Sequence, residues 1–269
     1  MIARSYLFVP GDRPERFDKA LATEAHRVVI DLEDAVAIDV KVQARTQIAQ
    51  WLQSPLSDEV RERVVIRVNA YGTPWHEEDV SMVRAASVRA VMAPKAEDAA
   101  QLADIAARCV EGVELIALVE SVAGVVRMRE IAQSGRVTRL AFGSFDFGVD
   151  AGIDGTAREL DYVRSQFVIE SRFAGLPPPV DGVTLATGDV DAINADVLDA
   201  RRFGFGGKLC IHPKQVDSVN TGFAPSGAER EWAARVLAAL EANPRGAISV
   251  DGKLVDKPIV DRARRIQAA

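Results

Sequence analysis

Short apolar runs alternate with longer amphipathic stretches through most of the chain. The short runs are rich in Val, Ile and Leu, which is typical of buried strands, and the longer stretches have helical spacing. We predict strands near residues 5–10, 27–33, 63–69, 90–95, 115–121, 138–143, 179–185 and 206–211. We predict helices between them near residues 13–25, 38–53, 76–86, 97–110, 122–134, 157–174 and 189–203.

This alternation predicts parallel strands joined by right-handed crossovers. Eight such strands in a chain of 269 residues match the usual size of a (β/α)8 TIM barrel, which is the α/β fold we expect for residues 1–222. The alternative is an open doubly wound sheet. It is disfavoured because the first predicted strand is followed by Val9-Pro10-Gly11-Asp12, a turn rather than a glycine-rich dinucleotide loop.

The alternation stops after Pro213. A helix is expected near residues 226–242, followed by a short linker from Ala247 to Val255. A last helix is expected from Asp256 to Gln267, with a proline in its first turn. Residues 223–269 are therefore predicted to form a C-terminal helical extension that could serve as a lid.

Two carboxylates follow neighbouring predicted strands, Glu120 after residues 115–119 and Asp146 after residues 140–143. A parallel barrel gathers its strand ends on the rim where ligands bind. Carboxylate oxygens without nearby histidine or cysteine suit Mg²⁺, which keeps several waters and needs only one or two protein ligands. The alternatives are that the pair acts as general acid and base, or is ion-paired with Arg67 and Lys95.

Arg67 ends a strand otherwise made of Val and Ile. Its guanidinium could hold a substrate carboxylate through two parallel bonds, or could neutralise Glu33 or Asp34. Asp31 and Glu33 are expected on one face of a strand, with Asp34 beginning the turn. We expect these three acids to support metal-bound water and Arg67 or Lys95 rather than to bind metal directly. Lys95, among carboxylates, should stay protonated and act electrostatically.

Other candidate side chains follow the first, second and eighth predicted strands. Lys19 and Lys41 could meet phosphate groups, although a solvated helix face is the simpler interpretation for either one. His212 could line the pocket or could be a packed, hydrogen-bonded histidine. The three histidines show no zinc-site spacing.

The formal net charge of −6 disfavours nucleic-acid binding, and no apolar run approaches the length of a membrane span. Cys109 and Cys210 are isolated from each other, which fits a reducing compartment. The first predicted strand begins near Ser5 and leaves no room for a signal peptide. We therefore expect a cytoplasmic protein that binds neither membrane nor nucleic acid.

Several motifs in this order resemble the citrate lyase β-subunit-like family of the HpcH/HpaI aldolase/citrate lyase superfamily. They are Arg4-Ser5-Tyr6-Leu7-Phe8-Val9-Pro10-Gly11, Asp31-Leu32-Glu33-Asp34-Ala35-Val36, Arg67-Val68-Asn69, Pro94-Lys95 and Gly207-Lys208-Leu209-Cys210-Ile211-His212-Pro213. The resemblance implies a trimer or hexamer in which Glu120 and Asp146 bind Mg²⁺ and Arg67 holds the carboxylate of an oxo acid.

The resemblance also implies a coenzyme A channel and a lid. It places Phe8, Lys19, Lys41, Ile211 and His212 along the channel. The stretch Gly252-Lys253-Leu254-Val255-Asp256-Lys257-Pro258 is similar to the family's lid motif, whose aspartate acts in the active site of an adjacent subunit. Asp256 would then be the catalytic acid.

The implied activity is a Mg²⁺-dependent carbon–carbon lyase. It would cleave a 3-hydroxyacyl-CoA thioester, such as malyl-, citramalyl- or citryl-CoA, into an oxo acid and an acyl-CoA. In the reverse direction it would join these two compounds. One alternative is a class II pyruvate aldolase, which resembles the chain at Asp31-Leu32-Glu33 but typically has histidine where Asp34 stands. Two others are a β-type subunit acting on an acyl-carrier-protein thioester and a catalytically silent binding barrel.

Overall fold

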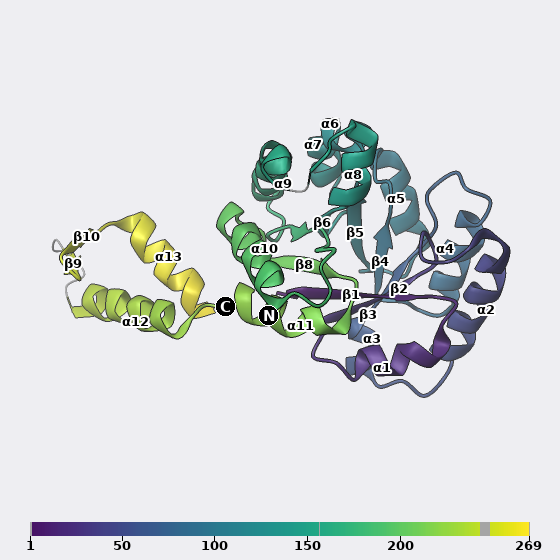
Figure 1. Ribbon diagram of the computed structural model, residues 1–269, viewed down its shortest axis with the longest axis horizontal. Helices are drawn as coiled ribbons and strands as arrows, with labels where there is room; N and C mark the ends of the chain where they lie inside the picture. The colour runs from purple at the N-terminus through teal and green to yellow at the C-terminus, as the bar shows by residue number, and fades with distance from the viewer. Residues whose placement is uncertain (1, 156, 243–247, 269) are drawn as a thin grey trace.

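A computed structural model describes residues 2–155, 157–242 and 248–268. Eight parallel strands pair in sequence order and close into a barrel, so the predicted (β/α)8 fold is confirmed (Figure 1). The strands are β1 (Ser5–Pro10), β2 (Arg27–Asp31), β3 (Val64–Arg67), β4 (Ala90–Ala93), β5 (Glu114–Val119), β6 (Arg139–Phe142), β7 (Val180–Asp181) and β8 (Gly207–Cys210). Each predicted strand is present, and several end earlier than predicted because the polar residues after them belong to loops.

Helices cover the outside of the barrel (Figure 1). They are α1 (Phe17–Leu21), α2 (Lys41–Leu52), α3 (Asp58–Arg63), α4 (His76–Ala85), α5 (Ala99–Arg108), α6 (Val122–Val126), α7 (Met128–Gln133), α8 (Ser144–Ala151), α9 (Asp161–Phe173), α10 (Val190–Phe203) and α11 (Val216–Phe223). Single 3₁₀ turns precede four of them, at Pro14–Arg16, Ile38–Val40, Arg158–Leu160 and Pro213–Gln215. The helices α3, α8 and α11 were not predicted.

Strand alternation divides the apolar side chains between two layers. Val29, Met92 and Ile116 point into the barrel, where they pack in a buried cluster. Val28 and Ile30 point outward and join the larger core between the strands and the helices. Because parallel strands are covered on both faces, each reads as a nearly continuous apolar run.

The C-terminal extension consists of α12 (Gly227–Ala242), β9 (Ile248–Val250), β10 (Lys253–Val255) and α13 (Lys257–Ala268). The prediction of a linker is wrong for residues 248–255, which are the described part of that segment. There β9 and β10 pair as an antiparallel hairpin. Residues 243–247 lie outside the described ranges. The two helices lie side by side and project to one side of the barrel, with the hairpin at the far end (Figure 1).

The extension has its own small core, in which Ala233 and Val236 of α12 pack against Val260 and Ala263 of α13. Within the described ranges, no helix is both long and apolar enough to cross a membrane.

Candidate active site

A cleft of about 550 Å³ lies at the carboxyl ends of the barrel strands. Its lining comes from residues at or just after β1, β2, β3, β5, β6, β7 and β8: Phe8, Asp31, Asp34, Ala35, Arg67, Leu118, Glu120, Gly143, Ser144, Phe145, Asp146, Val183, Leu185, Leu209 and Ile211. The volume falls within the range of small-molecule sites, roughly 300–1,000 Å³. The rim therefore gathers five of the predicted polar residues, Asp31, Asp34, Arg67, Glu120 and Asp146, into one space.

Arg67 is fixed at the base of this cleft by Asp31. The Nε and Nη2 atoms donate to the two Asp31 oxygens at 2.7 and 2.6 Å. Nη1 lies 3.0 Å from Glu33 Oε2, and the guanidinium stands 4.9 Å from the centre of the Phe8 ring. Burial alone would lower the pKa of Arg67, but the carboxylates of Asp31 and Glu33 outweigh it and raise the pKa. The cleft thus holds a permanent, oriented positive charge.

The acidic loop after β2 is arranged around this arginine. Asp31 is fully buried and accepts backbone N–H groups of Glu33 and Ala35, so its carboxylate shapes the loop as well as holding Arg67. Glu33 lies beyond the end of β2 and not within a strand as predicted, because β2 stops at Asp31. Asp34 is exposed and lines the cleft itself.

Lys95 connects Glu33 with Glu120. Its Nζ donates to Glu33 Oε1 at 2.9 Å, and its backbone N–H donates to Glu120 Oε1 at 2.8 Å. The hydrogen bond to Glu33 raises the pKa of Lys95, so the ammonium stays protonated. Lys95 adopts a φ of +46°, a left-handed conformation that is uncommon for residues other than glycine. That backbone turn aims its N–H at Glu120.

Glu120 and Asp146 line the same cleft, Glu120 directly after β5 and Asp146 in the first turn of α8, which follows the adjacent strand β6. Glu120 is 3% exposed, and its Oε2 accepts no hydrogen bond from any described residue. Burial, with Glu33 as a further cause, raises the pKa of Glu120 to about 8. Burial and the neighbouring Asp34 also raise the pKa of Asp146. Both carboxylates therefore resist ionisation in the absence of a cation. A cation bound between them would stabilise their ionised forms.

The residues present fit Mg²⁺. Within the described ranges no three His, Cys, Asp or Glu side chains converge as a complete metal cage. Mg²⁺ does not require one, because it is usually held by one or two carboxylates and keeps several waters. Gly143 leaves room for the side chain of Glu120. A Cβ added at position 143 would lie 2.4 Å from Glu120 Cβ and 2.6 Å from Glu120 Oε2.

The predicted channel residues are distributed differently. Phe8 and Ile211 line the cleft, and Lys19 is exposed on α1. Lys41 is buried, and its Nζ donates to the carbonyl oxygens of Leu32 and Glu33 at 2.8 and 2.7 Å. In this structure its ammonium therefore anchors the acidic loop, and a place for Lys41 along a coenzyme A channel stays a prediction.

His212 caps a short helical turn instead of pointing free into the cleft. Its Nδ1 accepts the backbone N–H of Lys214 at 3.1 Å, and Gln215 Oε1 accepts the backbone N–H of His212 at 3.2 Å. This is the packed, hydrogen-bonded interpretation that the sequence left open.

Asp256 lies at the junction of β10 and α13, outside the barrel. Its side chain is exposed, and Oδ1 accepts the backbone N–H of Ile259 at 3.3 Å, as an N-cap does. Figure 1 places this junction at the end of the extension remote from the barrel. The structure does not bring Asp256 to the cleft of its own chain.

Some lining residues were not predicted, notably Ser144, Phe145, Val183 and Leu185. They belong to α8 and to the loop after β7. Apolar and hydroxyl side chains at loop positions give no chemical signal of their own in a sequence.

Together, the closed parallel barrel, the acidic rim and the oriented arginine define a (β/α)8-barrel protein whose rim carboxylates fit a hard cation. The chain belongs to the HpcH/HpaI aldolase/citrate lyase family, whose sequence model matches residues 4–213.

Relatives in this family match nearly the whole chain. A citrate lyase subunit beta-like protein from Mycobacterium tuberculosis is 37% identical over 266 residues, covering 96% of this chain and 92% of the relative. A (3S)-malyl-CoA thioesterase from Cereibacter sphaeroides is 34% identical over 273 residues, covering 98% and 93%. The crystal structure of CitE from Mycobacterium tuberculosis in complex with magnesium, acetoacetate and coenzyme A matches with a TM-score of 0.85 and 34% identity, covering 99% of this chain and 97% of that one.

Proposed function

We propose that this protein is a Mg²⁺-dependent carbon–carbon lyase acting on a 3-hydroxyacyl-CoA thioester whose hydroxyl-bearing carbon also carries a carboxylate. Cleavage would give a 2-oxo acid and an acyl-CoA, and the reverse reaction would join them. The observation that supports this most is the buried, unpartnered Oε2 of Glu120 in the same cleft as Asp146 and Arg67. A ligand with a carboxylate and an adjacent oxygen complements that arrangement.

Glu120 and Asp146 are the residues that would hold Mg²⁺. When bound there, the ion supplies Lewis-acid polarisation of the oxygen that changes between hydroxyl and carbonyl. Arg67 would bind the substrate carboxylate with the N–H donors left unused, since an arginine has five, Asp31 takes two and Glu33 lies against a third. Asp31 and Glu33 would keep the guanidinium in one orientation.

In the cleavage direction the hydroxyl group gives its proton to water in the open cleft, and the bond between its carbon and the thioester α-carbon breaks. The electron pair of that bond passes to the α-carbon. Asp256 from a neighbouring subunit would donate a proton to this carbon, and would remove one in the condensing direction. Phe8 and Ile211, at the cleft edge formed by β1 and β8, would contact the coenzyme A portion.

The decisive experiment offers purified protein malyl-, citramalyl- and citryl-CoA with and without Mg²⁺. We expect release of a 2-oxo acid that depends on Mg²⁺ and is lost in Glu120→Gln. Thiol release is measured in parallel, because a thioesterase frees coenzyme A without forming an oxo acid. Coenzyme A release alone would contradict the lyase, and activity restricted to an acyl-carrier-protein thioester would favour a β-type subunit.

A further inference from the structure

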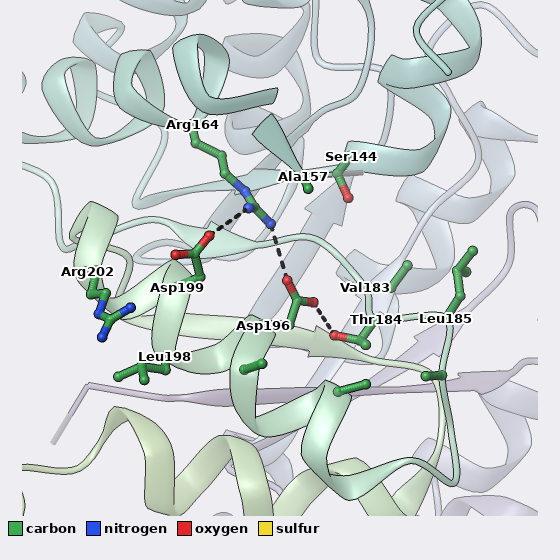
Figure 2. Close-up of a pocket in the computed structure, with 13 residues that line it drawn as sticks. Ser144, Ala157, Arg164, Val183, Thr184, Leu185, Asp196, Leu198, Asp199 and Arg202 are labelled. Atoms are coloured by element: carbon green, nitrogen blue, oxygen red, sulfur yellow. Dashed lines mark hydrogen bonds and ion pairs between the residues drawn. The ribbon is translucent and has the colours of Figure 1, made fainter. Parts of the chain in front are cut away.

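A second cavity of about 630 Å³ lies beside the cleft, between α10, α9 and the loop after β7 (Figure 2). Ser144, Val183 and Leu185 line both spaces. Ser144 lies two residues before Asp146 in the sequence, so the shared wall stands next to the acidic site. The second cavity is therefore a side extension of the cleft toward β6 and β7, away from Phe8 on β1.

Much of the lining of the second cavity is apolar. Ala192, Ala195 and Leu198 recur every third residue on α10 and so share one face of that helix. Ala195 is exposed and Leu198 is 45% exposed, so this face borders open space. In Figure 2, Arg202 and Leu198 lie at the opposite end from Ser144, whereas the apolar Val183 and Leu185 lie on the side of Ser144.

Three of the charged groups in the wall, Arg164, Asp196 and Asp199, are paired, and the fourth, Arg202, is exposed. Lys208 is buried and its Nζ lies 2.9 Å from both Asp181 and Asp196, and Arg164 Nη2 lies 3.1 Å from Asp181 and 3.6 Å from Asp196. The Thr184 hydroxyl also donates to Asp196 (Figure 2). Burial would raise the pKa of Asp196, but Lys208 and Thr184 outweigh it and lower the pKa. This network makes the wall rigid and leaves its carboxylates neutralised.

We infer that the second cavity receives the substituent on the hydroxyl-bearing carbon of the substrate, and that the chain takes 2-oxo acids with an aliphatic side chain longer than the methyl group of pyruvate. The inference rests on the proposed function, which places the oxo acid between Arg67, Glu120 and Asp146. The coenzyme A portion is directed to the β1–β8 side, so the substituent points to the side of Ser144. The apolar side chains of Val183 and Leu185 on this side would bind a hydrocarbon chain by removing it from water.

The test compares the binding of pyruvate and 2-oxohexanoate to the intact protein in the presence of Mg²⁺ by calorimetric titration. We expect 2-oxohexanoate to bind about tenfold more tightly than pyruvate, because its added methylenes enter an apolar pocket. In Ala195→Phe the ring enters the cavity from an exposed helix position, and this ratio should fall to about one. Ala107→Phe, at an exposed position of α5 remote from the cavity, is the matched control and should keep the tenfold ratio.

Pyruvate binding without any gain for 2-oxohexanoate in the unmodified protein would overturn this inference alone. A ratio that survives in Ala195→Phe would also overturn it, because the chain would then lie elsewhere. Failure of both oxo acids to bind with Mg²⁺ would instead contradict the proposed function, and the inference with it.

Discussion

The guanidinium of Arg67 has a fixed plane, set by its two bonds to Asp31 and its contact with the Phe8 ring. A lysine offers one rotating ammonium and cannot reproduce this planar grip. We predict that Arg67→Lys raises KM for the oxo acid by at least about tenfold and lowers kcat. Steady-state kinetics in the condensing direction measures both.

The control for this substitution is Arg45→Lys. Arg45 also pairs with a buried aspartate, Asp79, at 2.6 Å, but it does not line the cleft. Arg45→Lys should leave the KM for the oxo acid unchanged. If Arg67→Lys kept the KM of the unmodified protein, Arg67 would have a structural role only.

Glu120 also predicts a pH dependence of stability. Without metal its folded-state pKa is raised from 4.5 to about 8. Between these values the unfolded chain releases the Glu120 proton while the folded protein retains it. The contribution of Glu120 to stability is therefore fully present below pH 4.5 and is lost as pH rises through 8. The free energy of unfolding should fall across this window by at most about 5 kcal/mol because of Glu120.

Urea unfolding at pH 5 and pH 8 with a chelator measures this decline, and Glu120→Gln should show a smaller one. Mg²⁺ at pH 8 should restore stability to the unmodified protein, since it binds the ionised carboxylate. If the free energy of unfolding had the same pH dependence in the unmodified protein and in Glu120→Gln, burial would not control the ionisation of Glu120.

The junction between β6 and α8 is the secondary-structure boundary on which the proposed metal site depends most. A Cβ at Gly143 would overlap Glu120, whereas the added Cβ of Gly188 would meet nothing within 4 Å. We predict that Gly143→Ala displaces the Glu120 carboxylate, destabilises the protein by about 1–3 kcal/mol and weakens Mg²⁺ binding. Calorimetric Mg²⁺ titration and urea unfolding measure the two effects. Gly188→Ala should change neither, and normal Mg²⁺ affinity in Gly143→Ala would show that Glu120 can move without cost.

Helices and strands with a strong hydrophobic period could be predicted from the sequence. Short polar helices, and helices that begin directly after a strand, could not. The strands β1 to β6 are apolar runs with polar residues only at their ends, whereas α3 is only six residues, Asp58–Arg63, and mostly charged. Helix α8 begins within two residues of the end of β6, so it looked like a strand terminus. The β9–β10 hairpin had a signal that was missed: Asp251 and Gly252 both have positive φ, as the two-residue turns favoured by Asp-Gly require.

The site shows the same division. The strand-end positions of Arg67, Glu120 and Asp146 follow from topology, because a parallel barrel brings all carboxyl ends to one rim. The partner of each charge does not follow from sequence. Lys41 could be placed near the second strand, but its bonds to two carbonyl oxygens depend on how the loop before α2 folds back.

At the scale of the whole molecule, the extension is a separate helical hairpin joined to the barrel near α11 (Figure 1). Arg201 of α10 contacts Glu229 of α12 at 2.7 Å, which ties the base of the extension to the barrel. Strand β10 of the hairpin carries Leu254, which is 67% exposed, two residues before the exposed Asp256. An apolar side chain and an acid held away from their own barrel are suited to a surface of another subunit.

We therefore predict that Asp256 completes the cleft of a neighbouring subunit. Asp256→Asn keeps a residue that caps α13 but removes the acid, so its inactivity would not arise from loss of the helix. Mixing inactive Asp256→Asn subunits with inactive Glu120→Gln subunits, followed by subunit exchange, should restore activity at about a quarter of the sites, since each needs both kinds in the right order. Asp261→Ala on the same helix should remain active and serves as the control. Mixed oligomers without recovery, together with full activity of Asp256→Asn alone, would leave Asp256 as a helix cap and return the proton transfer to the residues of the cleft.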